Sequence, residues 1–270
     1  THKTSSAASD VYKRQIRMLA DRFNTLQMGM VGSSRVFELL DSDEYIFQKN
    51  AFNLDGFKGN IKFENVFFSY DQKEPVFNGL SFEVKAGQTV AIVGPTGAGK
   101  TSLINLISRY YEFQKGRIKL DELDIRDIDL NILRSKIAVV LQEVFLFNTS
   151  ILKNITIGDK NISRQEVINA AKKVGVHEFI NQLPNGYDFE VKERGGLLSS
   201  GQRQIIAFLR AYVYKPQLLI LDEATSSIDS FSEEYIQNAT IEITKSRTSI
   251  IIAHRLSTIQ NADAILVMDK

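Results

Sequence analysis

The segment GPTGAGKT, residues 94–101, has the residue types and the spacing needed to hold a chain of phosphates. It matches the pattern G-x-x-x-x-G-K-[ST], in which a glycine-rich turn lets backbone N–H groups surround phosphate oxygens at the start of a helix. In such a turn Lys100 reaches the β- and γ-phosphates and Thr101 offers a hydroxyl to Mg²⁺. The sequence therefore predicts a nucleoside triphosphate site. The residues expected to form it are Gly94, Pro95, Thr96, Gly97, Ala98, Gly99, Lys100, Thr101 and Ser102.

Two adjacent carboxylates, Asp222 and Glu223, follow the apolar run at residues 218–221. Asp222 can hold the Mg²⁺ shell, whereas Glu223 can orient the water that attacks the γ-phosphate and accept its proton. Nucleotide binding alone does not need the second carboxylate. The pair therefore predicts hydrolysis; the alternative, two solvated acids at the start of a loop, is disfavoured by the P-loop that precedes them.

The segment LSSGQ, residues 198–202, predicts the start of a helix. Ser199 or Ser200 can cap that helix, and its free N–H groups can attract a phosphate. Because the P-loop already holds one nucleotide, this segment is either an ordinary cap or a second anion site. The residues of the candidate second site are Ser199, Ser200, Gly201 and Gln202.

Four short apolar runs must position these groups, and each run is followed by a polar residue or a glycine. They span residues 90–93, 137–141, 218–221 and 250–253, and they are followed by Gly94, Gln142, Asp222 and His254. Runs of this kind are typical of strands in a parallel sheet, whose ligands bind beyond the carboxyl ends of the strands. Helical patterns at residues 100–110, 164–174, 202–214 and 232–244 fit the crossover connections.

Alternating residues outside these runs predict further strands. Apolar residues alternate in two registers over residues 61–70, which indicates an antiparallel strand with a bulge at Glu64 and Asn65. Residues 80–84 alternate in the same way, and residues 264–268 predict one more strand. A turn at residues 85–88 leads into the first parallel strand.

The composition narrows the classes of function. The chain has 33 basic and 32 acidic residues, which are interspersed, so no basic footprint for nucleic acid is present. It has no cysteine, which excludes disulfides and thiolate metal sites and fits a reducing compartment. No apolar run approaches the roughly 18 residues that span a bilayer.

Taken in order, GPTGAGKT, LQEVF, LSSGQRQ, LILDEATSSID and IIAHRLS resemble the motifs of the nucleotide-binding domain of ABC transporters, over residues 61–270. The resemblance implies an α/β fold with a P-loop NTPase (RecA-like) parallel-sheet core. It also implies an N-terminal antiparallel β subdomain and an inserted α-helical subdomain. The ligands would be ATP and Mg²⁺, and the activity ATP hydrolysis.

The same resemblance implies a head-to-tail dimer, in which the LSSGQ segment of a second ATPase domain closes over each ATP. It implies that Tyr70 stacks on adenine, that Gln142 contacts Mg²⁺ and the attacking water, and that His254 contacts the γ-phosphate. Asp229 would belong to a loop that couples the two sites. Ser200 departs from the family's LSGGQ, which usually has glycine at that position.

Apolar residues at helical spacing over residues 16–40 resemble the cytoplasmic end of the last transmembrane helix of exporters that carry membrane and ATPase domains in one chain. Glu193-Arg194-Gly195 resembles the exporter segment that touches the coupling helices of the membrane domain. We therefore expect a membrane domain upstream in the same chain. We also expect a bacterial exporter at the cytoplasmic face of the cell membrane.

The expected organisation has four parts. Residues 1–15 are expected to be a translated sequencing adapter or a disordered tail, since SSAASDVYKRQ resembles such an adapter. Residues 16–45 would form the end of the membrane helix and residues 46–60 a linker. Residues 61–270 would form the ATPase domain, truncated before the family's final helices.

Two alternatives remain at this point. A separate ATPase subunit of an importer would share every phosphate motif but would lack a helix at residues 16–40. A DNA-associated ATPase with a related domain would carry long coiled coils, yet residues 101–199 show no sustained heptads.

Overall fold

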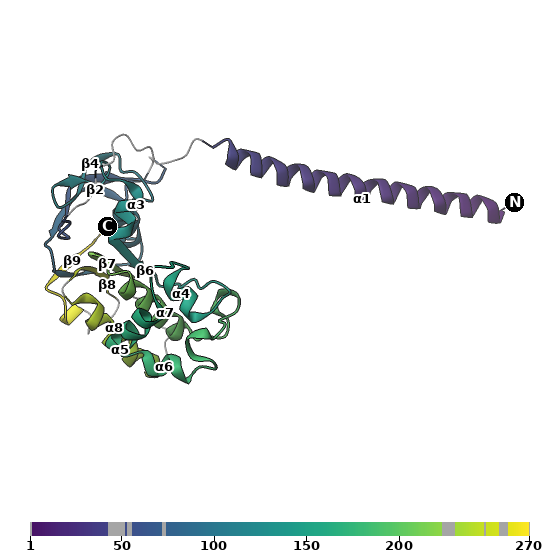
Figure 1. The fold of residues 1–270 in the computed structure, drawn as a ribbon. Helices are drawn as coiled ribbons and strands as arrows, with labels where there is room; N and C mark the ends of the chain where they lie inside the picture. The colour runs from purple at the N-terminus through teal and green to yellow at the C-terminus, as the bar shows by residue number, and fades with distance from the viewer. Residues whose placement is uncertain are drawn as a thin grey trace. The chain divides into compact units, whose positions relative to one another are not determined.

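The computed structural model describes residues 2–42, 52, 56–71, 74–222, 230–245, 247–253 and 259–269. The chain divides into two units, Thr1–Phe47 and Gln48–Lys270, and each is described here by itself (Figure 1). None of the helices in the described ranges combines the length and the apolar character that crossing a membrane requires.

The first unit contains one long helix, α1 (His2–Leu40). Helix α1 begins at His2, within the residues 1–15 that the sequence interpretation assigns to a translated sequencing adapter or a disordered tail. The physical reason is composition, because residues 2–15 contain no glycine or proline and include Ala7 and Ala8. From Tyr12 onward the side chains of α1 are exposed, including those of Leu19 and Phe23. Helix α1 includes residues 16–40, so the helix predicted there from the spacing of apolar residues is confirmed.

The second unit is built on a parallel sheet of five strands in the order β6-β7-β8-β3-β9. Its strands are β3 (Thr89–Val93), β6 (Ile137–Val140), β7 (Leu218–Asp222), β8 (Thr248–Ile252) and β9 (Ala264–Val267). All neighbouring pairs are parallel. The four strands predicted from apolar runs, and the fifth predicted at residues 264–268, are thereby confirmed.

A second, antiparallel sheet has the order β2-β1-β4-β5. Its strands are β1 (Ile61–Phe68), β2 (Phe77–Val84), β4 (Lys115–Leu120) and β5 (Leu123–Asp124). The register of β1 shifts between Phe63 and Val66, which confirms the predicted bulge. The subdomain is not wholly N-terminal as expected, because β4 and β5 follow the P-loop helix in the sequence.

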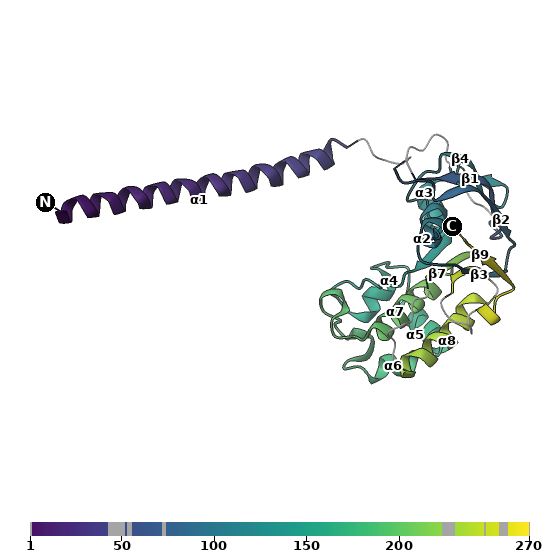
Figure 2. The same ribbon diagram turned by 180° about the vertical axis from the view of Figure 1, so that it is seen from behind.

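Helix α2 (Lys100–Ile107) lies between the two sheets, as Figure 2 shows. Leu103, Ile104, Leu106 and Ile107 are buried and share one hydrophobic core with residues of both sheets. The helix that begins at the P-loop is therefore fixed on two sides by apolar packing.

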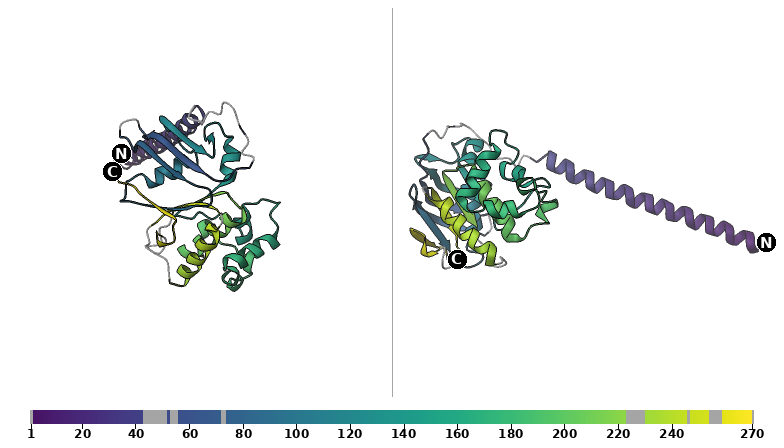
Figure 3. Two further views of the ribbon diagram at one scale, coloured as in Figure 1. Left: turned by 90° about the vertical axis from the view of Figure 1, so that its left-hand side faces the viewer. Right: turned by 60° about the horizontal axis from the view of Figure 1, so that its bottom comes forward.

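Helix α3 (Leu130–Lys136) lies on the same side as α2 (Figure 2), and its Leu133 belongs to the core that α2 shares with both sheets. The remaining helices cover the other face of the parallel sheet (Figures 1 and 3). They are α4 (Ile151–Thr156), α5 (Arg164–Val174), α6 (His177–Gln182), α7 (Ser200–Val213) and α8 (Ser230–Thr244), with two 3₁₀ turns at Gly186–Asp188 and Glu193–Gly195. Helices α4 to α8 share a second core with one face of the sheet. The helices between β6 and β7 are the inserted helical subdomain.

The expected linker at residues 46–60 packs in part against the ATPase domain. The Phe52 backbone forms a parallel bridge with Ile128, and its N–H donates to the Asp127 carbonyl at 2.9 Å. Phe57 packs on the first core, and a Cβ at Gly59 would come within 2.6 Å of the Thr248 hydroxyl oxygen. The domain therefore includes residues before Ile61.

Arg109 is a buried cation that joins the end of α2 to the segment after β5. Its side chain is 2% exposed; Nε contacts Glu112 at 2.8 Å, and Nη1 donates to the carbonyls of Ile125 at 3.2 Å and Ile128 at 3.4 Å. Those carbonyls would lose a buried donor without it.

We predict that Arg109→Met lowers the free energy of unfolding by about 3 kcal/mol, because a chain of similar length leaves buried carbonyls without this donor. Urea denaturation measures the change. Arg117→Met is the matched control: Arg117 is exposed on β4, so its replacement should change stability by less than about 0.5 kcal/mol. Equal losses in the two variants would contradict the prediction.

Candidate functional site

The P-loop lies between β3 and α2, which is the context that its sequence pattern requires. Gly97 and Gly99 have φ of +85° and +89°, a region that favours glycine. A Cβ at Gly94 would come within 2.3 Å of the Met268 carbonyl oxygen, and one at Gly99 within 2.7 Å of the Phe77 ring. The glycines are therefore required both by backbone conformation and by close packing.

The start of α2 is suited to an anion. Gly99 is the N-cap and provides no side-chain hydrogen bond to the first turn. The N–H groups of that turn have no partner within the helix, so they can donate to a ligand. Thr101 is exposed, whereas Ser102 is buried.

Lys100 folds back over the loop that precedes it. Its Nζ donates to the carbonyl of Gly94 at 2.8 Å and to that of Pro95 at 2.9 Å. The ammonium group is therefore held against the backbone at the start of the glycine-rich turn.

The register of the parallel sheet places the predicted positions at one edge. Ile92 of β3 pairs with Ile252 of β8, and Ile252 pairs with Asp222 of β7. The carboxyl ends of the three strands are therefore level, two strand spacings or about 10 Å across. Asp222 ends β7 next to the strand that precedes His254.

Three predicted residues, Glu223, Asp229 and His254, lie outside the described residues. In the sequence Glu223 follows β7 directly, Asp229 comes six residues later, and His254 is the second residue after β8; their roles stay predictions. Within the described ranges, no three His, Cys, Asp or Glu side chains gather in a way that could hold a metal ion.

Gln142 is exposed and lies two residues beyond Val140, which pairs with Leu221 of β7. Strand β6 is, however, the outermost strand on one side of the sheet, and β7 and β8 lie between it and β3. Three strand spacings are about 14 Å, so Gln142 follows the same carboxyl end of the sheet, but its strand lies farther from β3 than β7 and β8 do.

Tyr70 is anchored to the P-loop helix. Its hydroxyl donates to the Ser102 hydroxyl at 3.0 Å and accepts from the Asn105 amide at 3.2 Å. The Tyr111 ring meets its ring edge-on, with centroids 4.9 Å apart, and half of the Tyr70 surface remains exposed. An exposed aromatic face beside the P-loop helix fits the predicted stacking on a base.

The sequence interpretation missed Asn105 and Tyr111. Asn105 could have been found from its helical spacing to Ser102, because residues three apart share one face. Tyr111 gives no such signal, since it follows α2 in an irregular segment.

The LSSGQ segment begins α7 with a capping box. The Ser199 hydroxyl accepts from the Gln202 N–H at 3.2 Å, and the Gln202 side-chain oxygen accepts from the Ser199 N–H at 3.0 Å. Ser199 is therefore the cap, one of the two residues predicted for it. Ser199 and Ser200 are exposed, whereas Gly201 is buried.

The sequence profile of ABC transporters matches residues 77–226, which is more than half of the chain. The chain belongs to the ABC transporter family. The order of its motifs, the P-loop between β3 and α2, and the two-sheet fold with inserted helices agree with this assignment. The predicted family, fold class and ATPase character are confirmed.

Known relatives of this ABC protein are longer than the chain. An uncharacterized ABC transporter ATP-binding protein of Bacillus subtilis is 48% identical over 255 residues, which are 94% of this chain and 42% of the relative. A fatty acid ABC transporter ATP-binding/permease protein of Mycobacterium bovis is 46% identical over 261 residues, with 95% and 41% covered. The solved structure of a bacterial Atm1-family ABC exporter with ATP bound is 40% identical and has a TM-score of 0.79, with 92% and 43% covered. The chain spans about two fifths of the length of these relatives.

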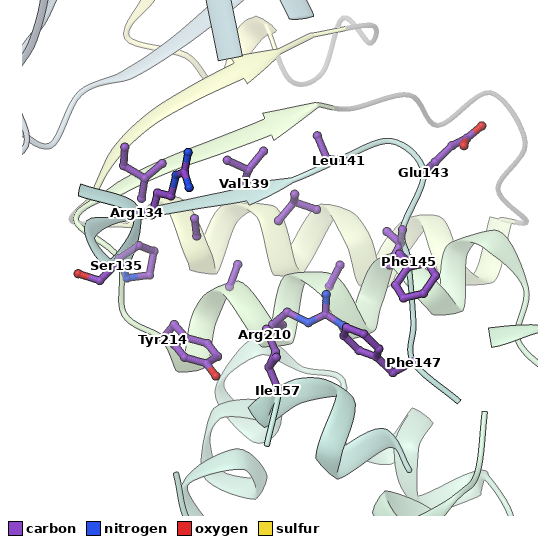
Figure 4. Close-up of a pocket in the computed structure, with 17 residues that line it drawn as sticks. Arg134, Ser135, Val139, Leu141, Glu143, Phe145, Phe147, Ile157, Arg210 and Tyr214 are labelled. Atoms are coloured by element: carbon purple, nitrogen blue, oxygen red, sulfur yellow. The ribbon is translucent and has the colours of Figure 1, made fainter. Parts of the chain in front are cut away.

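The ABC domain also has a pocket of 540 Å³ outside the phosphate site, between the edge strand β6 and helix α7 (Figure 4). Its wall carries the exposed apolar side chains of Leu141, Phe145, Phe147 and Ile157. Arg210 lines it from α7; burial lowers the pKa of this guanidinium, and its Nη2 is a buried donor without a partner among the described residues. Leu141 and Glu143, the neighbours of Gln142 in the sequence, also line this pocket, just after the end of β6.

Asn154 fixes the wall of this pocket. Its side-chain oxygen accepts from the Phe147 N–H at 2.8 Å, and its amide donates to the Phe147 carbonyl at 3.0 Å and to the Ser150 carbonyl at 3.1 Å. The Asn154 carbonyl in turn accepts from Nε of Arg210 at 2.9 Å. The segment after β6 is thereby tied to both α4 and α7.

We predict that Gly99→Ala destabilises the ABC domain more than Gly87→Ala. Both glycines have positive φ, +89° and +76°, but only Gly99 has Phe77 and Val76 in the way of a Cβ. The positive φ should cost about 1–2 kcal/mol in each variant, and the clash should add roughly 1–3 kcal/mol at Gly99. Urea unfolding without nucleotide measures both, and equal losses would show that the packing around Gly99 is loose.

Proposed function

We propose that this ATPase domain binds and hydrolyses ATP with Mg²⁺ to drive export across a membrane, as half of a dimer. The observation that supports this most is the shared register of β3, β8 and β7, because it brings the P-loop, Asp222 and the positions after β8 to one edge of the sheet. Membership of the ABC family supports ATP as the ligand.

At this edge each group of the chain would have its own role in ATP binding or hydrolysis. The first turn of α2 and Lys100 would hold the β- and γ-phosphates, exchanging the two carbonyls that Lys100 now contacts for phosphate oxygens. Tyr70 would stack on adenine. Glu223 would take the proton of the attacking water, with His254 and Gln142 orienting that water. Mg²⁺, held through Thr101 and Asp222, would neutralise charge on the phosphates.

The candidate second anion site at the start of α7 supports a dimer. The capping box at Ser199 leaves the start of α7 exposed, and within one chain no second nucleotide is needed there. A head-to-tail partner would use Ser199, Ser200, Gly201 and Gln202 to close over the ATP on the facing P-loop. Asp229 would lie in the loop between the two sites.

Export is favoured over the importer alternative by the relatives. Those described as ATP-binding/permease proteins combine both parts in one polypeptide, and this chain covers only about two fifths of them. The apolar pocket beside β6 has a surface suited to the membrane half of such a protein, and Glu193-Arg194-Gly195 would touch the same half. The domain would then work at the cytoplasmic face of a bacterial cell membrane.

We predict that Glu223→Gln keeps ATP binding but lowers the turnover rate at least about 100-fold, because the amide cannot accept the proton of the attacking water. Phosphate release measures turnover, and calorimetry measures binding. Glu178→Gln, an exposed change on α6, is the control and should leave both values unchanged.

The same variant tests the dimer. With hydrolysis blocked, ATP should convert Glu223→Gln from monomer to dimer in sedimentation experiments, and ADP should not. Unchanged turnover would refute the role of Glu223, whereas ATP binding without dimer formation would refute the shared site.

We predict that Lys100→Ala weakens ATP binding roughly tenfold or more, because it removes charge-assisted hydrogen bonds to the phosphates. Lys85→Ala is the matched control, since Lys85 is exposed in the turn at the opposite end of β3. Similar dissociation constants for the two variants would place the phosphates elsewhere.

A further inference from the structure

A second, smaller pocket of 280 Å³ lies in the helical part of the ATPase domain, away from the P-loop. It is lined by the exposed face of α5, by the end of α7 and by the residue that precedes β8. Three cations reach it, Lys173, Lys215 and Arg247, and the carboxylate of Glu166 accompanies them. These side chains leave two positive charges in excess at the pocket.

The guanidinium of Arg247 is the least satisfied of these groups. Its Cζ lies over the Tyr212 ring, 5.0 Å from the ring centroid. Its Nη1 is buried and has no hydrogen-bond partner among the described residues. A buried N–H of this kind costs free energy until an acceptor reaches it.

The one carboxylate at the pocket is already engaged. Glu166 accepts from the Ser163 N–H at 2.8 Å and from its hydroxyl at 2.9 Å, as the capping box of α5. These bonds, together with the charge of Lys215, lower the pKa of Glu166. Within the described residues, none of the three cations has a carboxylate within salt-bridge distance.

We propose that this pocket binds a small phosphate monoester. A dianion matches the two excess charges, whereas a carboxylate would leave one of them uncompensated. The Tyr212 ring, Ile162 and Val213 provide an apolar wall for the ester group. The pocket is smaller than typical drug-sized sites of about 300–1,000 Å³, so the ester group is small. The competing explanation is that Lys173 and Lys215 only complement the C-terminal dipoles of α5 and α7.

Methyl NMR of the 270-residue chain can separate this pocket from the P-loop, which also attracts phosphate. The Ile162 methyl reports on the pocket, and the Ile92 methyl reports on the end of β3 before the P-loop. Inorganic phosphate and phenyl phosphate are the probes, and benzoate is the matched monoanion. We expect the Ile162 signal to shift saturably with both phosphates and to respond much more weakly to benzoate.

Lys215→Gln and Arg247→Gln should each weaken the Ile162 response about tenfold while leaving the Ile92 response unchanged, because each removes a charged donor. Lys172→Gln, a neighbouring cation on α5 that does not line the pocket, is the control and should match the unmodified chain. Since Lys215 is exposed, its variant keeps the test valid even if Arg247→Gln unfolds. An unmoved Ile162 signal, equal affinity for benzoate and phenyl phosphate, or equal effects of Lys172→Gln and Lys215→Gln would each overturn the proposal.

Discussion

The pairing of β3 with β8 is the constraint on which the functional edge of this domain depends. It sets Ile92 level with Ile252, and the next pairing sets Ile252 level with Asp222. A slip of one residue would move each strand-end group to the other face of the sheet. The strands resist such a slip because both of their faces are buried, one against α2 and the antiparallel sheet and the other against α4 to α8.

Backbone N–H groups at two helix starts, those of α2 and α7, are candidate anion-binding groups of this domain. The starts of α2 and α7 both expose N–H groups, but they are finished differently. Gly99 leaves the first turn of α2 bare, whereas Ser199 and Gln202 close a capping box on α7. The first turn of α2 thus keeps its N–H groups free for a ligand, whereas the start of α7 is already ordered by its own side chains.

Much of the fold could be predicted because its core strands carry unbroken apolar runs, which only a doubly covered sheet accommodates. The bulge in β1 was visible as a change of register at Glu64 and Asn65. By contrast, β4 has the sequence KGRIKL, whose charges hide its two buried residues. Strand order could not be predicted either, because it depends on packing between distant segments. The distance of β6 from β3 and the role of Arg109 were missed for such reasons. The roles of Glu223, Asp229 and His254 stay predictions.

The bonds of Asn154 have a mechanical consequence. Its side chain joins Phe147 to α4, and its carbonyl holds Arg210 near the end of α7. Helix α7 has 14 residues and is therefore a stiff rod of about 21 Å, with Ser199 capping its other end. A displacement of Phe147 would therefore act on α7 through Asn154 and Arg210, and α7 can carry it as a rigid body to Ser199 at its other end.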